Sequence, residues 1–432
     1  MFDIKEVSEK TRSLLRDRGC ETYSFKISET EKQELNTEID EFSLFRTTFD
    51  NGISVTTIKS GAKGSSSGND LTDGGIDMTV SSALLSAESS APDEANKIAE
   101  YQEPEVFNTG VYEPDMDLFY DRLEELINDV TARHPKIKIL QIIADHTRTH
   151  SIYANSNETV YETFSGAYNL SILFAGSDGE KTTGMAGAGI STYSLDTPFI
   201  LQGSIEKQLT DAENSLDPME LKGKFEGTVV FTPECAVQFI YMLISNFASA
   251  GGLLEGTSLW KDKLGQKVAD GKLSLTLKAE DDRITEIPGY TEDGYKAEDV
   301  SLIKNGILDS FLIDLYSAEK TGQKVAKNTS FALVMDPGDT PYEDMVRDIK
   351  KGLIVGGFSG GSPGANGEFS GVAKNSFYVE DGKIVGAVSE TMINGNLETV
   401  FANIKAISRE TVCDGSTVLP YFSTDTIVIS GK

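Results

Sequence analysis

Hydrophobic residues near the start of the chain recur with helical spacing. One face of a predicted helix, which Gly19 ends, collects Ile4, Val7, Thr11, Leu14 and Leu15. From residue 21 to residue 59 the pattern alternates as in β-strands, and Asp50-Asn51-Gly52 has the composition of a hairpin turn. We therefore expect three strands of an antiparallel sheet, with the Gly- and Ser-rich residues 61–69 as a flexible loop.

The rest of the first half alternates between helical and extended patterns. Helices are predicted at residues 78–90, 115–133 and 197–214, and strands at residues 137–175 with a turn at 155–157. Composition then shifts toward Asp and Glu, and residues 217–227 have the character of a domain boundary. We expect two domains, at residues 1–216 and 217–432.

The second half opens with a short strand and a clear helix start. Thr232 is placed as the N-cap, Pro233 at the first helical position and Glu234 near the positive helix end. Residues 236–254 that follow contain no charge. Gln238, Asn246 and other polar residues interrupt them, which favours a buried core helix over a membrane span.

Short strands dominate the remainder. They are predicted at residues 273–277, 300–303, 307–315, 376–379, 384–388, 404–408 and 427–429, with one helix that begins at Thr340 and ends at Gly352. Helices and strands are segregated rather than alternating. This predicts an α+β fold with largely antiparallel sheets and a β-rich C-terminal domain resembling a barrel or sandwich.

Composition excludes several classes of protein. The 432 residues contain 39 Lys and Arg against 68 Asp and Glu, a net charge of −29 without a basic run, which argues against nucleic-acid binding. Cys20, Cys235 and Cys413 lie too far apart for a disulfide framework or a Cys-x-x-Cys metal site. The first residues are charged and lack a signal-peptide pattern, so we expect a cytoplasmic protein.

The candidate catalytic residues have ordinary interpretations. His146 and His150 have a zinc-like spacing, but on a strand they lie about 13 Å apart, so we interpret them as a surface strand pair. His134 is expected to cap a helix. Glu280-Asp281-Asp282 fits a solvated turn better than paired catalytic carboxylates, and Cys413 is expected to be an unreactive thiol.

Residues 356–371 contain seven glycines in sixteen positions. They lack the Lys-Ser/Thr of a phosphate-binding loop and are predicted to follow a helix, so phosphate binding is disfavoured. Two interpretations stay open. Either the segment is a long connection, or its bare backbone approaches a ligand or an extended peptide closely.

An ordered set of motifs resembles the PmbA/TldD family, the so-called modulators of DNA gyrase, and is closer to its PmbA (TldE) branch. These motifs are Thr232-Pro233-Glu234-Cys235-Ala236, Gly256-Thr257-Ser258, Leu264 to Ala269, Lys304-Asn305-Gly306-Ile307-Leu308, Leu315-Tyr316-Ser317-Ala318, Gly356 to Gly371, Val388-Ser389-Glu390, Ile393 to Leu397 and Asp414-Gly415-Ser416. In the TldD branch the helix after this strand carries H-E-x-x-x-H, which implies zinc-dependent peptide hydrolysis. The corresponding residues here are Tyr241 to Asn246, none of which can hold zinc, and Cys413 lies near a further ligand position without its partners.

The resemblance implies a subunit without catalytic or metal-binding residues of its own. It would act in proteolysis or peptide maturation with a TldD-like metallopeptidase that carries the zinc, and would help enclose an extended or unfolded peptide. The candidate peptide- or partner-binding residues are Gly356, Gly357, Phe358, Gly360, Gly361, Asn366, Glu390, Asn394 and Asn396. Two alternatives stay open: a stand-alone hydrolase that uses His146 or the acids at 280–282, and a non-catalytic interaction protein, such as a homodimer.

Overall fold

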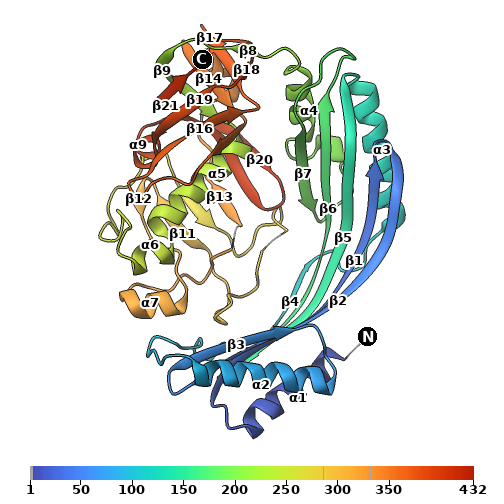
Figure 1. The fold of residues 1–432 in the computed structure, drawn as a ribbon, viewed down its shortest axis with the longest axis vertical. Coiled ribbons are helices and arrows are strands. Elements are labelled where there is room, and N and C mark those ends of the chain that lie inside the picture. The colour runs from blue at the N-terminus through green and yellow to red at the C-terminus, as the bar shows by residue number, and fades with distance from the viewer. Residues whose placement is uncertain (1–2, 286, 331) are drawn as a thin grey trace.

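Each half of the chain forms its own sheet in the computed structural model, which describes residues 3–285, 287–330 and 332–432. The first half contributes long strands that bend around one side of the second half (Figure 1). Its strands are β1 (Thr22–Glu38), β2 (Glu41–Lys59), β3 (Ala62–Gly68), β4 (Glu105–Gly110), β5 (Ile137–Asn155), β6 (Val160–Gly176) and β7 (Ala186–Thr192). Its helices are α1 (Ile4–Asp17), α2 (Asp73–Ser89), α3 (Met116–Arg133) and α4 (Ile205–Glu213).

Side-chain alternation gives this first sheet one apolar face and one polar face. The spatial order is β3-β2-β1-β5-β6-β4, with β7 also paired to β6, and every pair except β4/β6 is antiparallel. Phe25 and Ile27 of β1 pack in the core with α1 and α2, whereas α3 buries Phe119 and Leu123 against the β5/β6 region. Ser24 and Lys26 point the other way, toward the second half of the chain.

The second half forms a curled sheet around one apolar helix. Within the described residues the strand order is β12-β11-β10-β13-β21-β9-β14-β17-β18-β8, and β15, β16, β19 and β20 join off this path. The strands are β8 (Met219–Glu220), β9 (Lys224–Phe231), β10 (Leu275–Leu277), β11 (Val300–Lys304), β12 (Ile307–Leu308), β13 (Leu333–Met335), β14 (Lys351–Val355), β15 (Gly357–Gly360), β16 (Glu368–Lys374), β17 (Phe377–Glu380), β18 (Lys383–Ser389), β19 (Met392–Asn396), β20 (Ile404–Cys413) and β21 (Thr417–Ser430). The helices are α5 (Pro233–Leu243), α6 (Ala250–Leu254), α7 (Leu315–Thr321), α8 (Tyr342–Arg347) and α9 (Leu397–Ala402).

The uncharged stretch after Pro233 is buried as predicted, but it is not one continuous α-helix. A π-helical turn at Ile244–Ala248 separates α5 from α6. Phe239, Leu243 and Phe247 are fully buried in the core of the second half. No helix in the described part of the chain is both long and apolar enough to cross a bilayer.

Two predictions for the first half are wrong. Asp50-Asn51-Gly52 does not form a hairpin turn but pairs with Ser28–Thr30 in the middle of β1 and β2, and the chain reverses at Ile39, whose φ is +62°. Residues 61–69 are not a flexible loop, because Ala62–Gly68 is the edge strand β3. Gly64 is needed there for packing, since a Cβ would lie 2.1 Å from the backbone nitrogen of Ala87 in α2.

Several boundaries in the second half also differ. Of the predicted strand at 307–315 only Ile307–Leu308 is extended, and α7 begins at Leu315 with the Asp314 side chain as its cap. The helix predicted from Thr340 to Gly352 is only α8, without a capping box. The glycine-rich segment follows strand β14 rather than a helix and itself supplies β15 and β16.

The predicted α+β class with largely antiparallel sheets is confirmed. In the first half, α1, α2, α3 and the long strands β5 and β6 lie close to their predicted positions, while α4 is shorter and is preceded by a 3₁₀ turn at Phe199–Leu201. The proposed division at residues 216 and 217 falls in the connection between α4 and β8.

Candidate functional site

One contact between the two halves is formed by β7 and the residues just after it. The Ser191 N–H donates to Asp414 O at 2.9 Å, and the Thr285 N–H donates to Gly415 O at 2.6 Å. The Thr285 hydroxyl also donates to Ser191 Oγ at 2.6 Å, and the Tyr193 hydroxyl donates to Thr285 O at 3.0 Å. We call these five residues the interdomain contact. Cavities lie beside it, lined by both halves of the chain.

Two adjoining cavities, of about 520 and 500 Å³, lie where α5 begins. Both are lined by Gln208 of α4, Glu234 of α5, Gly356 and Asn375. The first half of the chain supplies α4 and β7 to their walls, and the second half supplies α5 and the ends of its strands. We call the pair the α5 cavity.

Polar groups without partners face the α5 cavity. Thr232 is only 3% exposed, and its Oγ1 has no hydrogen-bond partner among the described residues. Glu234 Oε1 is likewise buried without a partner within the described chain. Asp211 lies nearby and pairs with Lys207 at 2.5 Å, and burial raises the pKa of the Asp211 carboxyl group. A buried oxygen without a partner is costly, so these atoms indicate a place for a polar ligand.

A further cavity, of about 760 Å³, lies against the polar face of the first sheet. Strand hydroxyl groups line it, among them those of Ser24, Ser151 and Thr163, together with residue 285 and residues 287–293 of the second half. Thr163 Oγ1 and the Tyr290 hydroxyl are buried and have no partner in the described residues. Burial raises the pKa of Tyr290 to about 12, so this hydroxyl stays protonated at neutral pH.

The helix positions that correspond to the zinc motif carry no ligand chemistry. Tyr241 and Met242 are partly exposed on α5, and the Asn246 side chain donates to Gly364 O at 2.9 Å. A phenol, a thioether and an amide do not form a zinc site of the N/S/carboxylate type. Within the described chain there is also no group of three His, Cys, Asp or Glu side chains that could hold a metal ion. The absence of zinc itself stays a prediction.

The predicted peptide-binding residues lie in different environments. Phe358 is buried between the rings of Phe239 and Phe369, so it serves the core, and Gly360 packs against its ring. Gly356 lines the α5 cavity, and Gly357 follows it on β15.

The other predicted residues lie along the glycine-rich hairpin and β19. Gly361 and Asn366 are exposed in the β15–β16 connection, and Asn396 donates to Asn366 O at 2.7 Å. Asn394 pairs with Ser370 inside the sheet. Glu390 is exposed, with a φ of +47°, and forms an ion pair with Lys432. Of the nine residues, only Gly356 lines the α5 cavity.

The histidines do not form a common site. His146 and His150 lie on β5 as predicted, but the expectation of a surface pair is wrong for His146, which is 1% exposed and bonded through Nε2 to Val111 O at 2.7 Å. The His150 ring pairs with Glu162 at 2.8 Å. His134 is the C-cap residue of α3, as predicted, and also contacts Glu213.

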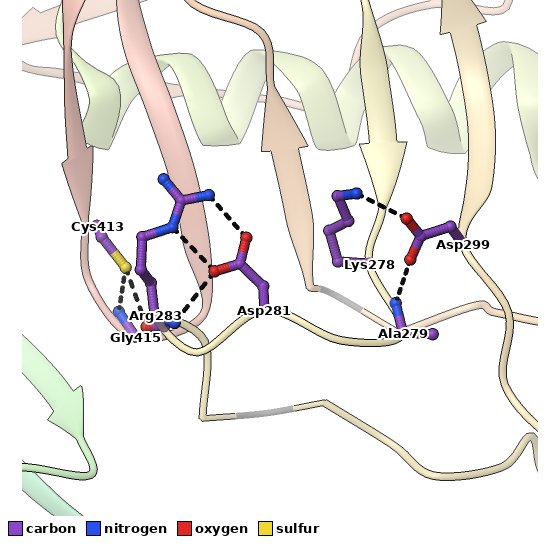
Figure 2. A network of polar contacts seen from close by, with 7 residues as sticks. All are labelled: Lys278, Ala279, Asp281, Arg283, Asp299, Cys413 and Gly415. Carbon is purple, nitrogen blue, oxygen red and sulfur yellow. Dashed lines mark hydrogen bonds and ion pairs between the residues drawn. The ribbon is translucent and has the colours of Figure 1, made fainter.

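Of the acids at 280–282, Asp281 lies near Cys413, and both contact Arg283 beside the interdomain contact (Figure 2). Asp281 accepts two hydrogen bonds from the Arg283 side chain, at 2.9 and 2.7 Å, in a turn between β10 and β11. The Cys413 thiol lies 3.2 Å from Arg283 O and accepts a hydrogen bond from the Gly415 N–H at 3.4 Å. Burial raises the pKa of the Cys413 thiol, which disfavours a reactive thiolate.

Sequence reasoning missed the polar groups of the α5 cavity. The sequence pattern places Glu234 only at the helix start and Thr232 only at the cap, although the Thr232 hydroxyl makes no capping bond. Lys207 and Asp211 come from α4, about 25 residues earlier in the chain. Their i, i+4 spacing shows an ion pair on one helix face, but the sequence does not show that this face meets α5.

The architecture is that of a two-domain α+β protein, with long bent strands in the first half and a curled sheet in the second. Residues 223–431 match the family model described as the PmbA/TldA metallopeptidase C-terminal domain. The C-terminal half of this chain thus matches the PmbA/TldD family, as the resemblance implied, and a PmbA relative is similar to it over most of its length.

Proteins named after TldD and proteins named after PmbA are both similar to this chain. The zinc metalloprotease TldD homolog of Saccharolobus solfataricus is 27% identical over 66% of this chain and 69% of its own length. The metalloprotease PmbA of Escherichia coli O157:H7 is 25% identical over 91% and 90%. A metalloprotease of Methanothermobacter thermautotrophicus is 27% identical, but the match spans only 44% of this chain and 43% of that protein. TldE from Thermococcus kodakarensis shares the fold, with a TM-score of 0.83 and 19% identity over 98% of this chain and all of that chain.

Proposed function

We propose that this protein is a PmbA/TldE-like subunit of a metallopeptidase-family complex in the cytoplasm. It acts in proteolysis or peptide maturation together with a TldD-like zinc peptidase that supplies the metal. Its own role is to help enclose an extended or unfolded peptide. Neither nucleic acid nor a membrane is a partner in this proposal.

The observation that carries the proposal is the chemistry of α5 and the turn after it. The C-terminal half matches the family model. In place of the histidine, glutamate and second histidine of the H-E-x-x-x-H motif, however, it has Tyr241, Met242 and Asn246. The Asn246 amide is already engaged with Gly364 in the glycine-rich connection. Asn246 thus holds the glycine-rich connection in place, a structural role that differs from binding a metal ion.

The names of similar proteins support a pair of unlike subunits. One similar protein is named a zinc metalloprotease TldD homolog, and a protein with the same fold is named TldE. Cavities lined by both halves of the chain offer space for a peptide. The glycine-rich hairpin borders the α5 cavity through Gly356, which is consistent with its proposed part in peptide or partner binding.

The test compares the chain alone with the chain after mixing with a TldD-like protein from the same host. We expect the purified chain to contain no stoichiometric zinc by elemental analysis and to cleave no unfolded peptide. The mixture should form a hetero-oligomer in size-exclusion chromatography and cleave peptides until a chelator removes the metal. Stoichiometric zinc together with hydrolysis by this chain alone would overturn the proposal.

The alternative of a stand-alone hydrolase makes an opposite prediction. Replacing His146 and His150 together would abolish its activity, whereas the proposed complex should retain most of its activity. The buried His146, bonded to a backbone carbonyl, is poorly placed to act on a substrate. The remaining alternative, a non-catalytic interaction protein or homodimer, predicts that no zinc-bearing partner co-purifies from the host.

A further inference from the structure

The α5 cavity contains an unpaired negative charge. No hydrogen bond or ion pair involves the Glu234 carboxylate within the described chain, and its Oε1 atom is buried. Asp211, on the facing helix α4, is already paired with Lys207, so this ion pair contributes no net charge. Lys374 lines the cavity as an exposed residue, which leaves its ammonium group in contact with solvent. Within the described residues, the buried Oε1 atom of Glu234 therefore has neither a hydrogen-bond donor nor a cation as its partner.

The second observation is the hydroxyl of Thr232. This side chain is almost fully buried, lines the same cavity and has no partner for Oγ1 among the residues that the structure describes. Thr232 precedes α5 with an extended backbone, yet its hydroxyl does not cap the helix. Two residues apart in sequence, the Thr232 and Glu234 side chains thus present uncompensated oxygen atoms to one space.

These oxygens select a particular ligand chemistry. A carboxylate only accepts hydrogen bonds, so the missing group must donate them. An anion is disfavoured by the Glu234 carboxylate, although the start of a helix would otherwise attract one. A metal ion is disfavoured because the described residues near the cavity do not provide three ligands of suitable type. A primary ammonium group supplies one positive charge and three donors, which Glu234 and Thr232 can accept.

We propose that the α5 cavity binds a primary ammonium group, held by the carboxylate of Glu234 and the hydroxyl of Thr232. The ammonium group belongs either to the N-terminus of a peptide or to a lysine side chain. The link to a peptide rests on the proposed function, whereas the binding of an ammonium group does not. The cavity continues on both sides of Glu234, so the rest of the ligand has space beyond the charged group.

The test uses the purified full chain without any partner, and isothermal titration calorimetry with three probes. These are triglycine, N-acetyl-triglycine, and the amide of N-acetyl-lysine. We expect at least one probe with a free amine to bind, and the acetylated tripeptide not to bind. Binding of triglycine alone identifies a peptide terminus, and binding of the lysine derivative alone identifies a side chain. Failure of all three probes at millimolar concentration would overturn the proposal.

Substitutions of Glu234 and Thr232 test whether these two residues bind the ammonium group or are only imperfectly packed. Glu234→Gln should weaken binding at least tenfold, because it removes the charge while keeping the shape. Thr232→Val should weaken binding severalfold without lowering the melting temperature, because it also removes a buried hydroxyl that lacks a partner.

Glu343→Gln is the matched control, since Glu343 is an exposed acid in the first turn of α8 and lines neither part of the cavity. Its binding should equal that of the wild type. Unchanged binding by Glu234→Gln would contradict the proposal. Because the assay contains no zinc peptidase, a failed reconstitution of the complex leaves its result unaffected, and the two proposals can fail separately.

Discussion

Gly415 lies against the main chain of Ser191 so closely that a Cβ at position 415 would be 1.9 Å from Ser191 O. The φ of Gly415 is +90°, a conformation that residues with a side chain rarely adopt. The two halves of the chain thus approach each other backbone to backbone at this point. The interdomain contact depends on the absence of a side chain as well as on its hydrogen bonds.

Gly415→Ala should therefore open the interdomain contact. We expect a loss of about 3 kcal/mol or more in the free energy of unfolding, because the clash with Ser191 adds to the backbone strain. Gly223→Ala is the control, since Gly223 has a φ of +74° with no atom near its Cβ position. That variant should lose only about 1 to 2 kcal/mol. Denaturant unfolding measures both, and equal losses would show that the contact contributes nothing.

The hydrogen bond from Asn246 to Gly364 should hold the glycine-rich connection in place. Asn246→Ala should increase amide hydrogen exchange at residues 364–368 and cost about 1 kcal/mol of global stability. Asn403→Ala removes a similar side-chain bond, to Thr399 O, within its own helix. It should leave exchange at residues 364–368 unchanged. Equal exchange in both variants would mean that Asn246 does not position this segment.

Asp211 should lower the free energy of unfolding as the pH rises, whereas most acids in folded proteins raise it. Because burial raises its pKa in the folded state, ionisation favours unfolding, and stability falls as the pH rises from the ordinary Asp pKa through the raised value. Asp211→Asn should thus melt at a higher temperature than the wild type at pH 7. The difference should vanish in acid, where Asp211 is protonated in both states. A variant that is less stable at pH 7 would indicate that the pair with Lys207 dominates.

The thiols should react slowly in the folded protein. Cys20 and Cys235 are buried, and burial raises the pKa of the partly exposed Cys413 thiol. We expect alkylation by iodoacetamide at pH 8 to be about tenfold slower than for free cysteine, and its rate to keep rising above pH 9. Cys413→Ser should remove most of the labelling that occurs without unfolding. Rapid reaction at pH 7 would instead reveal an activated thiolate.

Strong periodic patterns predicted the elements that pack an apolar face. The stripes of α1 and α3, and the long strands β5 and β6, were found near their true positions because their burial follows the sequence period. The edge strand β3 was missed because its Ser and Gly residues have no apolar alternation. Its pairing partner β2 and the covering helix α2 determine its conformation. The hairpin turn predicted at Asp50-Asn51-Gly52 is wrong for the same reason, because pairing with β1 overrides the local turn preference.

The candidate site could be predicted less well than the fold. The loss of ligand residues on α5 is visible in the sequence, because it concerns residue types at fixed spacing. The α5 cavity is not, because Asp211 and Glu234 belong to separate halves of the chain and meet only through the way the two sheets pack. Likewise, the buried state of His146 depends on its contact with Val111, 35 residues earlier.

The π-helical turn at Ile244–Ala248 changes which residues face the same direction. On a regular α-helix, positions 241 and 246 would be separated by about 140° around the axis. A π turn advances fewer degrees per residue, so it rotates position 246 back toward the side of position 241. The side chains at positions 241 and 246 thus lie closer to the same side of the helix than they would on a regular α-helix. The orientation of Tyr241 relative to Asn246 is therefore determined by the π turn as well as by their spacing in the sequence.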